Sequence, residues 1–101
     1  MRRAMGRRAA PLEKNIERAC LALAKKEDWL LPKWESAGNS GVPDRILIGP
    51  DKQIAFVEFK TPSGRQTPLQ KRWQAKLEER GFRYAVVRST SEFEHFLRSL
   101  A

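Results

Sequence analysis

The sequence contains little that could stabilise a protein covalently or anchor it in a membrane. Its single cysteine, Cys20, cannot form an internal disulfide, which excludes a disulfide-stabilised secreted domain and suits a reducing compartment. No apolar run approaches the roughly 20 residues needed to cross a bilayer, and no signal-peptide core is present. The 101 residues have room for one domain with a modest core. We therefore expect a cytoplasmic protein with no membrane partner.

Negative charge is also scarce. Twelve Asp and Glu stand against 20 Lys and Arg, which gives a formal net charge of +8. This excess favours a polyanionic partner such as nucleic acid, although a soluble protein that is merely basic remains an alternative. Residues 1–10 have no apolar face and carry Arg2, Arg3, Arg7 and Arg8. They predict a flexible basic arm, which either contacts phosphates or has no function, before a single domain over residues 11–101.

Hydrophobic periodicity and turn residues predict an α/β fold of the order α-β-β-β-α-β-α. The expected elements are a helix over 11–26, strands over 29–35, 44–48 and 53–60, a helix over 67–80, a strand over 82–88 and a helix over 91–100. Pro32 interrupts the first strand and places it near an edge. The strand–helix–strand unit over 53–88 implies parallel pairing. We therefore expect a mixed central β-sheet flanked by helices.

Three charged residues are brought together by this arrangement. Two β-rich runs around a Gly-Pro-Asp turn at 49–51 predict a hairpin, which places Asp44 near Glu58 and Lys60. Glu58 and Lys60 are two residues apart and therefore share a face of the strand. An ion pair that caps the sheet would explain these two residues alone. Asp44 adds a second carboxylate, which over-neutralises one lysine and suits a divalent cation.

Two carboxylates and an ammonium group are the groups needed to bind Mg²⁺ and cut a phosphodiester. Mg²⁺ prefers oxygen ligands and keeps several waters, so we expect Asp44, Glu58 and the backbone carbonyl of Phe59 to hold it. The metal would act as a Lewis acid. Lys60 is placed to orient or activate the attacking water and to steady charge that develops on the phosphate.

Two further polar residues each have two interpretations. Helical geometry places Glu13 at the border of the apolar face of the first helix and Glu17 further toward solvent, so Glu13 is the better candidate for the site. Glu13 is equally explained as an N-terminal glutamate favoured by the helix dipole. Gln70 stands three residues after Thr67, which is the pattern of a capping box, and it is also a candidate active-site residue.

Four motifs in order make the chain resemble a known family. They are Leu12-Glu13-Lys14, Gly41-Val42-Pro43-Asp44-Arg45, Val57-Glu58-Phe59-Lys60-Thr61-Pro62 and Thr67-Pro68-Leu69-Gln70. Together they look like the VRR-NUC (virus-type replication-repair nuclease) domain of the PD-(D/E)XK superfamily, over about residues 12–100. The resemblance implies a restriction-endonuclease-like core and cleavage of phosphodiesters that depends on Mg²⁺ or Mn²⁺. It also implies active-site roles for Glu13, Asp44, Glu58, Lys60 and Gln70, with Glu13 reaching the metal through water.

The resemblance also carries expectations about substrate and assembly. Free-standing domains of this kind are similar to phage and bacterial proteins that act on branched DNA as homodimers, which implies the cytoplasm of a bacterium or of a phage-infected host. We expect an endonuclease that is selective for branched DNA such as four-way (Holliday) junctions, with Arg45, Arg65, Lys71 and Arg72 as contacts to phosphate. The alternatives are a non-catalytic nucleic-acid-binding module and a sequence-reading endonuclease, for which the chain offers little material.

Overall fold

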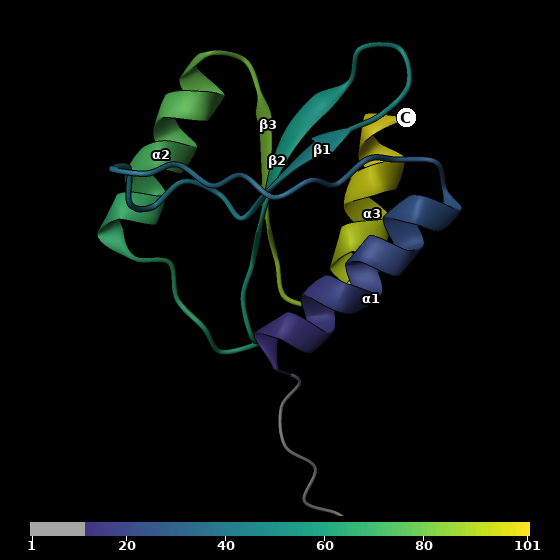
Figure 1. Cartoon of the computed structure of the whole chain (residues 1–101), viewed down its shortest axis with the longest axis horizontal. Helices are drawn as coiled ribbons and strands as arrows, with labels where there is room; N and C mark the ends of the chain where they lie inside the picture. Colours follow the sequence, from purple (N-terminus) through teal and green to yellow (C-terminus); the bar gives the residue numbers. More distant parts are fainter. Residues whose placement is uncertain (1–11) are drawn as a thin grey trace, which may run out of the picture.

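A computed structural model describes residues 12–101, so the expected basic arm over 1–10 lies outside the described residues. Within them the chain folds into α1 (Glu13–Lys26), β1 (Arg45–Ile48), β2 (Ile54–Phe59), α2 (Pro68–Glu79), β3 (Arg83–Val87) and α3 (Thr90–Leu100) (Figure 1). The strands form one sheet in the order β1-β2-β3. β1 pairs antiparallel with β2, and β2 pairs parallel with β3. The predicted α/β class with a mixed sheet is confirmed.

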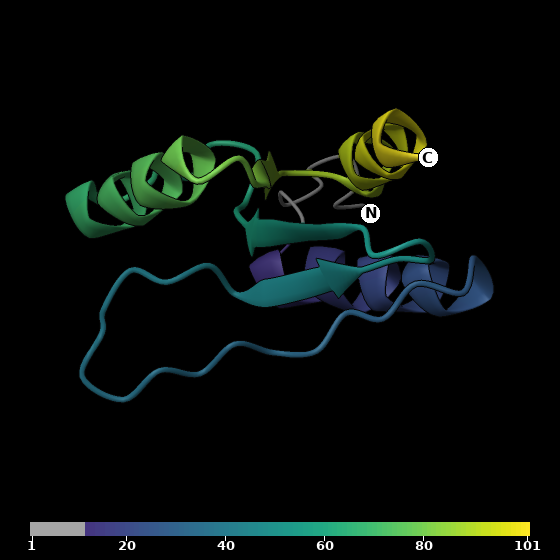
Figure 2. The ribbon, with the colours of Figure 1, turned by 90° about the horizontal axis from the view of Figure 1, so that it is seen from above.

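The helices cover the two faces of the sheet unequally. α1 and α3 lie on one face, and α2 lies alone on the other (Figures 1 and 2). The larger core lies under α1 and α3, where Ile16 and Phe93 pack with Val57 and Phe59 of β2. A smaller core, built on Phe56, Leu77 and Tyr84, lies under α2. β2 therefore has buried side chains on both faces, as its sequence predicts for a central strand.

The strand expected over 29–35 is the one element of the predicted order that differs. This segment runs antiparallel to β1 but forms only isolated bridges, Leu30 with Ile48 and Lys33 with Arg45. The Pro32 carbonyl accepts a bond from the Ile46 amide, yet proline has no N–H to return one. The ladder is therefore interrupted in the middle, and the segment borders the sheet without becoming a regular strand.

The crossover from β2 to β3 begins with a complete capping box. The Gln70 amide donates to the Thr67 hydroxyl at 3.1 Å, and the Thr67 amide donates to Gln70 Oε1 at 2.8 Å. The two bonds satisfy donors that the first turn of α2 would otherwise leave free, and Pro68 needs none. The start of α2 is therefore fixed, and with it the loop that leads from Lys60.

The loop before Asp44 packs directly on this helix start. Gly41 has a φ of 88°, and a Cβ atom there would lie 2.6 Å from the backbone carbon of Leu69. Only glycine combines this left-handed conformation with so close an approach. The contact fixes the chain just before Asp44 against the first turn of α2.

The buried thiol gives a test of this packing. Cys20 is 0% exposed beneath the sheet, and burial, followed by the nearby charge of Glu17, raises its pKa to about 12. The thiol therefore stays protonated and covered at pH 8. We expect Ellman's reagent to leave native protein unmodified at pH 8 and to titrate one thiol per chain once urea unfolds it. Rapid modification without denaturant would contradict the position of α1.

Candidate active site

The hairpin brings the two predicted carboxylates to one end of the sheet. The pairing of Arg45 with Val57 sets Asp44 opposite Glu58, one residue beyond the regular ladder. Asp44 Oδ2 accepts a bond from the Phe59 amide at 2.7 Å, and the Asp44 carbonyl accepts one from the Trp34 amide at 3.0 Å. Both the side chain and the backbone of Asp44 are thus held in place beside β2. The proximity expected from the turn is confirmed.

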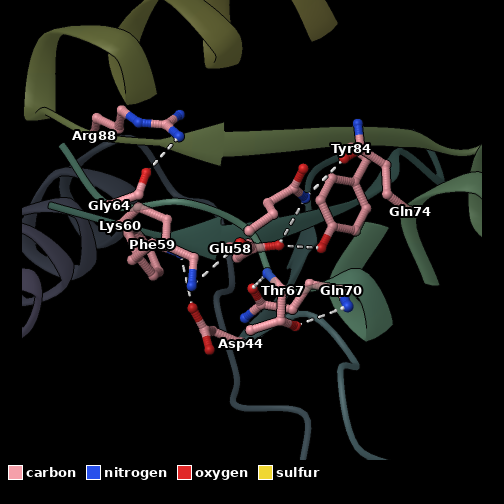
Figure 3. Close-up of polar contacts among 11 residues, drawn as sticks. Asp44, Glu58, Phe59, Lys60, Gly64, Thr67, Gln70, Gln74, Tyr84 and Arg88 are labelled. Atoms are coloured by element: carbon pink, nitrogen blue, oxygen red, sulfur yellow. Dashed lines mark hydrogen bonds and ion pairs between the residues drawn. The ribbon is translucent and has the colours of Figure 1, made fainter. Parts of the chain in front are cut away.

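Glu58 is the most buried charged group in this part of the molecule. Its side chain is 0% exposed, and Oε1 accepts two bonds, from the Tyr84 hydroxyl at 2.6 Å and from Gln66 Nε2 at 3.1 Å. Oε2 has no hydrogen-bond partner among residues 12–101. The nearest cation is Lys60, whose Nζ lies 3.7 Å from Oε2 (Figure 3). Oε1 therefore accepts two hydrogen bonds, whereas Oε2 only faces the ammonium group of Lys60.

The charges around Asp44 repel one another. Burial raises the pKa of Asp44, the bond from the Phe59 amide opposes this, and the charges of Glu17 and Glu58 raise the pKa further. Lys60 acts in the other direction, but one lysine faces several carboxylates. The site therefore carries more negative charge than its own residues neutralise, which is the condition that favours a bound cation.

The two glutamates of α1 lie differently from the expectation. Glu13 is exposed at the start of α1, and partial burial together with the charge of Asp44 raises its pKa, so it lies within electrostatic reach of the site. Glu17, expected nearer solvent, is half-buried, and its Oε2 accepts a bond from Arg45 Nε at 2.6 Å. The prediction for Glu17 was wrong because its partner, Arg45, comes from β1 and cannot be seen in the pattern of one helix.

Arg45 also needs a correction. It is 8% exposed, and besides Glu17 its Nη1 donates to the Leu31 carbonyl at 2.8 Å. The guanidinium joins α1, the 29–35 segment and β1 from inside the protein, so it lacks the free surface that a phosphate contact requires. The other basic candidates, Arg65, Lys71 and Arg72, have exposed side chains, on the loop before α2 and on its first two turns.

Gln70 takes the capping position that the sequence left open. Its Oε1 is bonded to the Thr67 amide, so this oxygen is committed to the end of α2. Figure 3 shows the two hydrogen bonds between Thr67 and Gln70 at the start of α2. A role for Gln70 at the reacting centre stays a prediction.

Three residues that touch Glu58 directly or indirectly were missed from the sequence: Gln66, Gln74 and Tyr84. Gln66 donates to both Glu58 and Gln74, the latter at 2.8 Å. Tyr84 is the only tyrosine of the chain and is followed in β3 by the apolar Ala85, Val86 and Val87. Parallel pairing sets it opposite Phe56, on the face of Glu58. A buried phenol beside a buried carboxylate was thus a usable signal, because a buried tyrosine hydroxyl normally finds a partner.

The donor set fits a hard divalent cation better than a softer metal. Asp44 and Glu58 offer carboxylate oxygens at one sheet end, and the oxygen of Glu58 without a donor in the described chain is buried. No group of three or more His, Cys, Asp and Glu side chains within residues 12–101 is arranged to hold a metal. Two carboxylates match Mg²⁺, which usually keeps several waters and binds through one or two protein carboxylates.

Among the described residues, none of the helices is long and apolar enough to cross a membrane.

Comparison with known proteins places the chain in a family. The family model described as the VRR-NUC domain matches residues 10–91. A protein of Acyrthosiphon pisum secondary endosymbiont phage 1, named "Putative nuclease p44", is 36% identical over 77 residues, which cover 76% of this chain and 83% of that protein. A solved structure described as a VRR_NUC domain is similar with a TM-score of 0.80 at 26% identity, covering 88% of this chain and 97% of that one. Matched over most of its length in sequence and in fold, the chain belongs to the VRR-NUC (virus-type replication-repair nuclease) family, as its motifs predict.

Proposed function

We propose that the protein is a metal-dependent DNA endonuclease, with Mg²⁺ as its cofactor and Mn²⁺ able to replace it. The family and the phage relative support a nuclease that acts on nucleic acid. The observation that carries the metal-dependent form is Glu58, a fully buried carboxylate whose Oε2 has no donor in the described chain. A buried charged oxygen is costly without a partner, and a cation shared with Asp44 supplies one.

Each residue of the site then has a distinct task. Asp44 and Glu58 hold the cation, with the Phe59 carbonyl and, through a water, Glu13 as further ligands. When bound, Mg²⁺ polarises a phosphate oxygen and makes a bound water more acidic. Lys60, 3.7 Å from Glu58 Oε2, orients the attacking water and donates to the phosphate as its negative charge grows. The water loses a proton to solvent as its oxygen bonds to phosphorus, the P–O ester bond breaks, and the departing oxygen takes up a proton from solvent.

The acidic site itself argues against a module that only binds nucleic acid. Asp44 and Glu58 would repel the phosphate of a bound strand in the absence of a cation, and burying Glu58 costs stability. A protein that only bound DNA would bind it more tightly and fold more stably if neutral residues replaced both carboxylates. Their arrangement around Lys60 favours an enzyme.

The surface beside the site supports a DNA substrate read by shape. Arg65 directly precedes Gln66, whose side chain contacts Glu58, and Lys71 and Arg72 follow on α2; all three basic residues are exposed. Exposed basic residues of this kind, in a chain with a net charge of +8, suit backbone phosphates. A homodimer would present two sites related by a two-fold axis, which matches the approximate symmetry of a four-way junction. We therefore propose branched DNA as the preferred substrate.

The first prediction concerns Glu58→Gln. We expect cleavage of labelled DNA in Mg²⁺ to fall by about a thousandfold or more, because a ligand of the cation is lost. Binding of the same DNA, measured by anisotropy in Ca²⁺, should persist or tighten, since one negative charge facing the phosphate is gone. Glu79→Gln, on an exposed residue at the end of α2, is the matched control and should cleave normally. Unimpaired cleavage by Glu58→Gln would reject this site.

The second prediction concerns stability. Because the pKa of Asp44 is raised in the folded state, its carboxyl stabilises the fold when protonated, and this contribution is lost as pH rises through the folded pKa. Asn keeps an acceptor for the Phe59 amide without the charge. In EDTA at pH 7, the urea midpoint of unfolding should therefore be higher for Asp44→Asn than for wild type. This difference in midpoint should vanish near pH 3. The control Asp51→Asn, at an exposed residue, should leave the urea midpoint unchanged at both pH values. Lower stability of Asp44→Asn at pH 7 would contradict the repulsion described.

The third prediction concerns assembly and substrate. We expect light scattering to give the mass of a dimer, and equal concentrations of four-way junction and linear duplex to be cleaved at rates that differ at least several-fold in favour of the junction. Nicks should map to opposing strands near the branch point. A monomer that cleaves both substrates equally would contradict the proposed selectivity while leaving the nuclease assignment intact.

A further inference from the structure

Within residues 12–101, only one oxygen of the Glu58 carboxylate accepts hydrogen bonds. Two donors from different elements converge on Oε1: the Tyr84 hydroxyl of β3 at 2.6 Å and Gln66 Nε2 of the loop before α2 at 3.1 Å. Oε2 receives no bond within residues 12–101. We propose that Tyr84 and Gln66 are positioning residues, which hold Glu58 so that it offers Oε2 alone to the cation. This inference rests on the proposed function, because it concerns the same metal site.

The sheet and the smaller core fix where the Tyr84 hydroxyl lies. Tyr84 is 8% exposed, pairs with Phe56 in the parallel ladder, and packs in the cluster under α2 with Phe56 and Leu77. Its hydroxyl donates to Glu58 Oε1 at 2.6 Å. A rigid ring packed in this cluster can hold one carboxylate oxygen in one place.

Gln66 is held as firmly by a chain of side-chain amides. Its Nε2 donates to Glu58 Oε1 and, at 2.8 Å, to Gln74 Oε1. Gln74 Nε2 in turn donates to Glu78 Oε2 at 3.2 Å, so the chain of hydrogen bonds runs along α2 away from Glu58 (Gln74 is labelled in Figure 3). An amide nitrogen has two hydrogens, and both are used here. Gln66 therefore cannot rotate to donate to Oε2 of Glu58 without breaking these two hydrogen bonds.

The consequence is a carboxylate with two unlike oxygens. Turning Glu58 to offer both oxygens to a cation, or to exchange them, would break its bonds to Tyr84 and to Gln66. With Oε1 occupied, the oxygen beside Lys60 is the one presented, and the ammonium group and the cation then share it. Groups of this kind, which orient a ligand without touching the metal, typically change metal affinity by 10–100-fold when removed.

The test uses metal binding and an NMR signal besides activity. Isothermal titration with Mn²⁺ should give a dissociation constant about tenfold weaker for Tyr84→Phe and for Gln66→Met than for wild type. Ser99→Ala, which removes a hydroxyl elsewhere, and Gln53→Met, which removes an amide bonded to the Leu100 carbonyl, are the matched controls and should bind as wild type. Urea unfolding of each variant shows which ones remain folded, and Gln66→Met keeps the test valid if Tyr84→Phe loosens the core.

The single tyrosine gives an independent reading, because ζ-¹³C-tyrosine labelling yields one ring signal. In metal-free protein we expect Glu58→Gln to shift this signal, since the bond partner changes from a carboxylate to an amide. Mg²⁺ should shift it in wild type and leave it unmoved in Asp44→Asn, which lacks a ligand.

The outcomes separate this inference from the proposed function. If wild type binds Mn²⁺ and cleaves DNA but folded Tyr84→Phe and Gln66→Met bind Mn²⁺ equally well, the positioning role is overturned and the nuclease stands. A tyrosine signal whose chemical shift changes neither with Glu58→Gln nor with Mg²⁺ also overturns the positioning role. If wild type neither binds Mn²⁺ nor cleaves, the proposed function fails, and the positioning role fails with it.

Discussion

The structure depends on the burial of one charged group, the Glu58 carboxylate at the end of the central strand. A carboxylate that is 0% exposed is tolerated only where donors or cations surround it. Tyr84 comes from β3, Gln66 from the loop before α2, and Lys60 from the position directly after the end of β2. Removing any of these three would leave a charge with less compensation in the interior. The pairing of β2 with β3 and the course of the chain into α2 are therefore tied to a single side chain.

The rest of the fold positions a second carboxylate against the first. The antiparallel hairpin sets Asp44 beside the Phe59 amide, the interrupted 29–35 segment holds the Asp44 carbonyl through Trp34, and Gly41 fixes the approaching loop on α2. Asp44 thus has backbone partners on two sides, and neither is a positive charge. A fold selected for stability alone would not gather carboxylates in this way, since burial and the charges of Glu17 and Glu58 all raise the Asp44 pKa. The arrangement makes physical sense when a cation is part of it.

The parts of this site that follow from local rules could be predicted from the sequence, and the parts that depend on distant contacts could not. The hairpin turn and the two-residue spacing place Asp44, Glu58 and Lys60, because pairing and strand period are local properties. The capping box at Thr67 is likewise local. The partnership of Arg45 with Glu17 joins residues 28 apart in the chain, and a helix pattern cannot reveal which carboxylate a strand arginine will reach. Pro32 indicated that the 29–35 strand would be interrupted. Whether a regular strand would still form depended on which carbonyls of β1 face Pro32, and the sequence does not reveal this.

The sign of the net charge differs from the sign of the charge around the site, and this difference bears on how a polyanion could approach the site. The chain has a net charge of +8, yet the surroundings of Asp44 and Glu58 are acidic. The exposed Arg65 lies on the loop before α2, beside Gln66, which donates to Glu58, and the exposed Lys71 and Arg72 lie on the first two turns of α2. A DNA backbone drawn to that basic edge by long-range attraction would meet the carboxylates only at short range, where a cation between them and the phosphate reverses the sign of the interaction. In the proposed nuclease, attraction over distance and repulsion at contact would together make productive binding conditional on the metal.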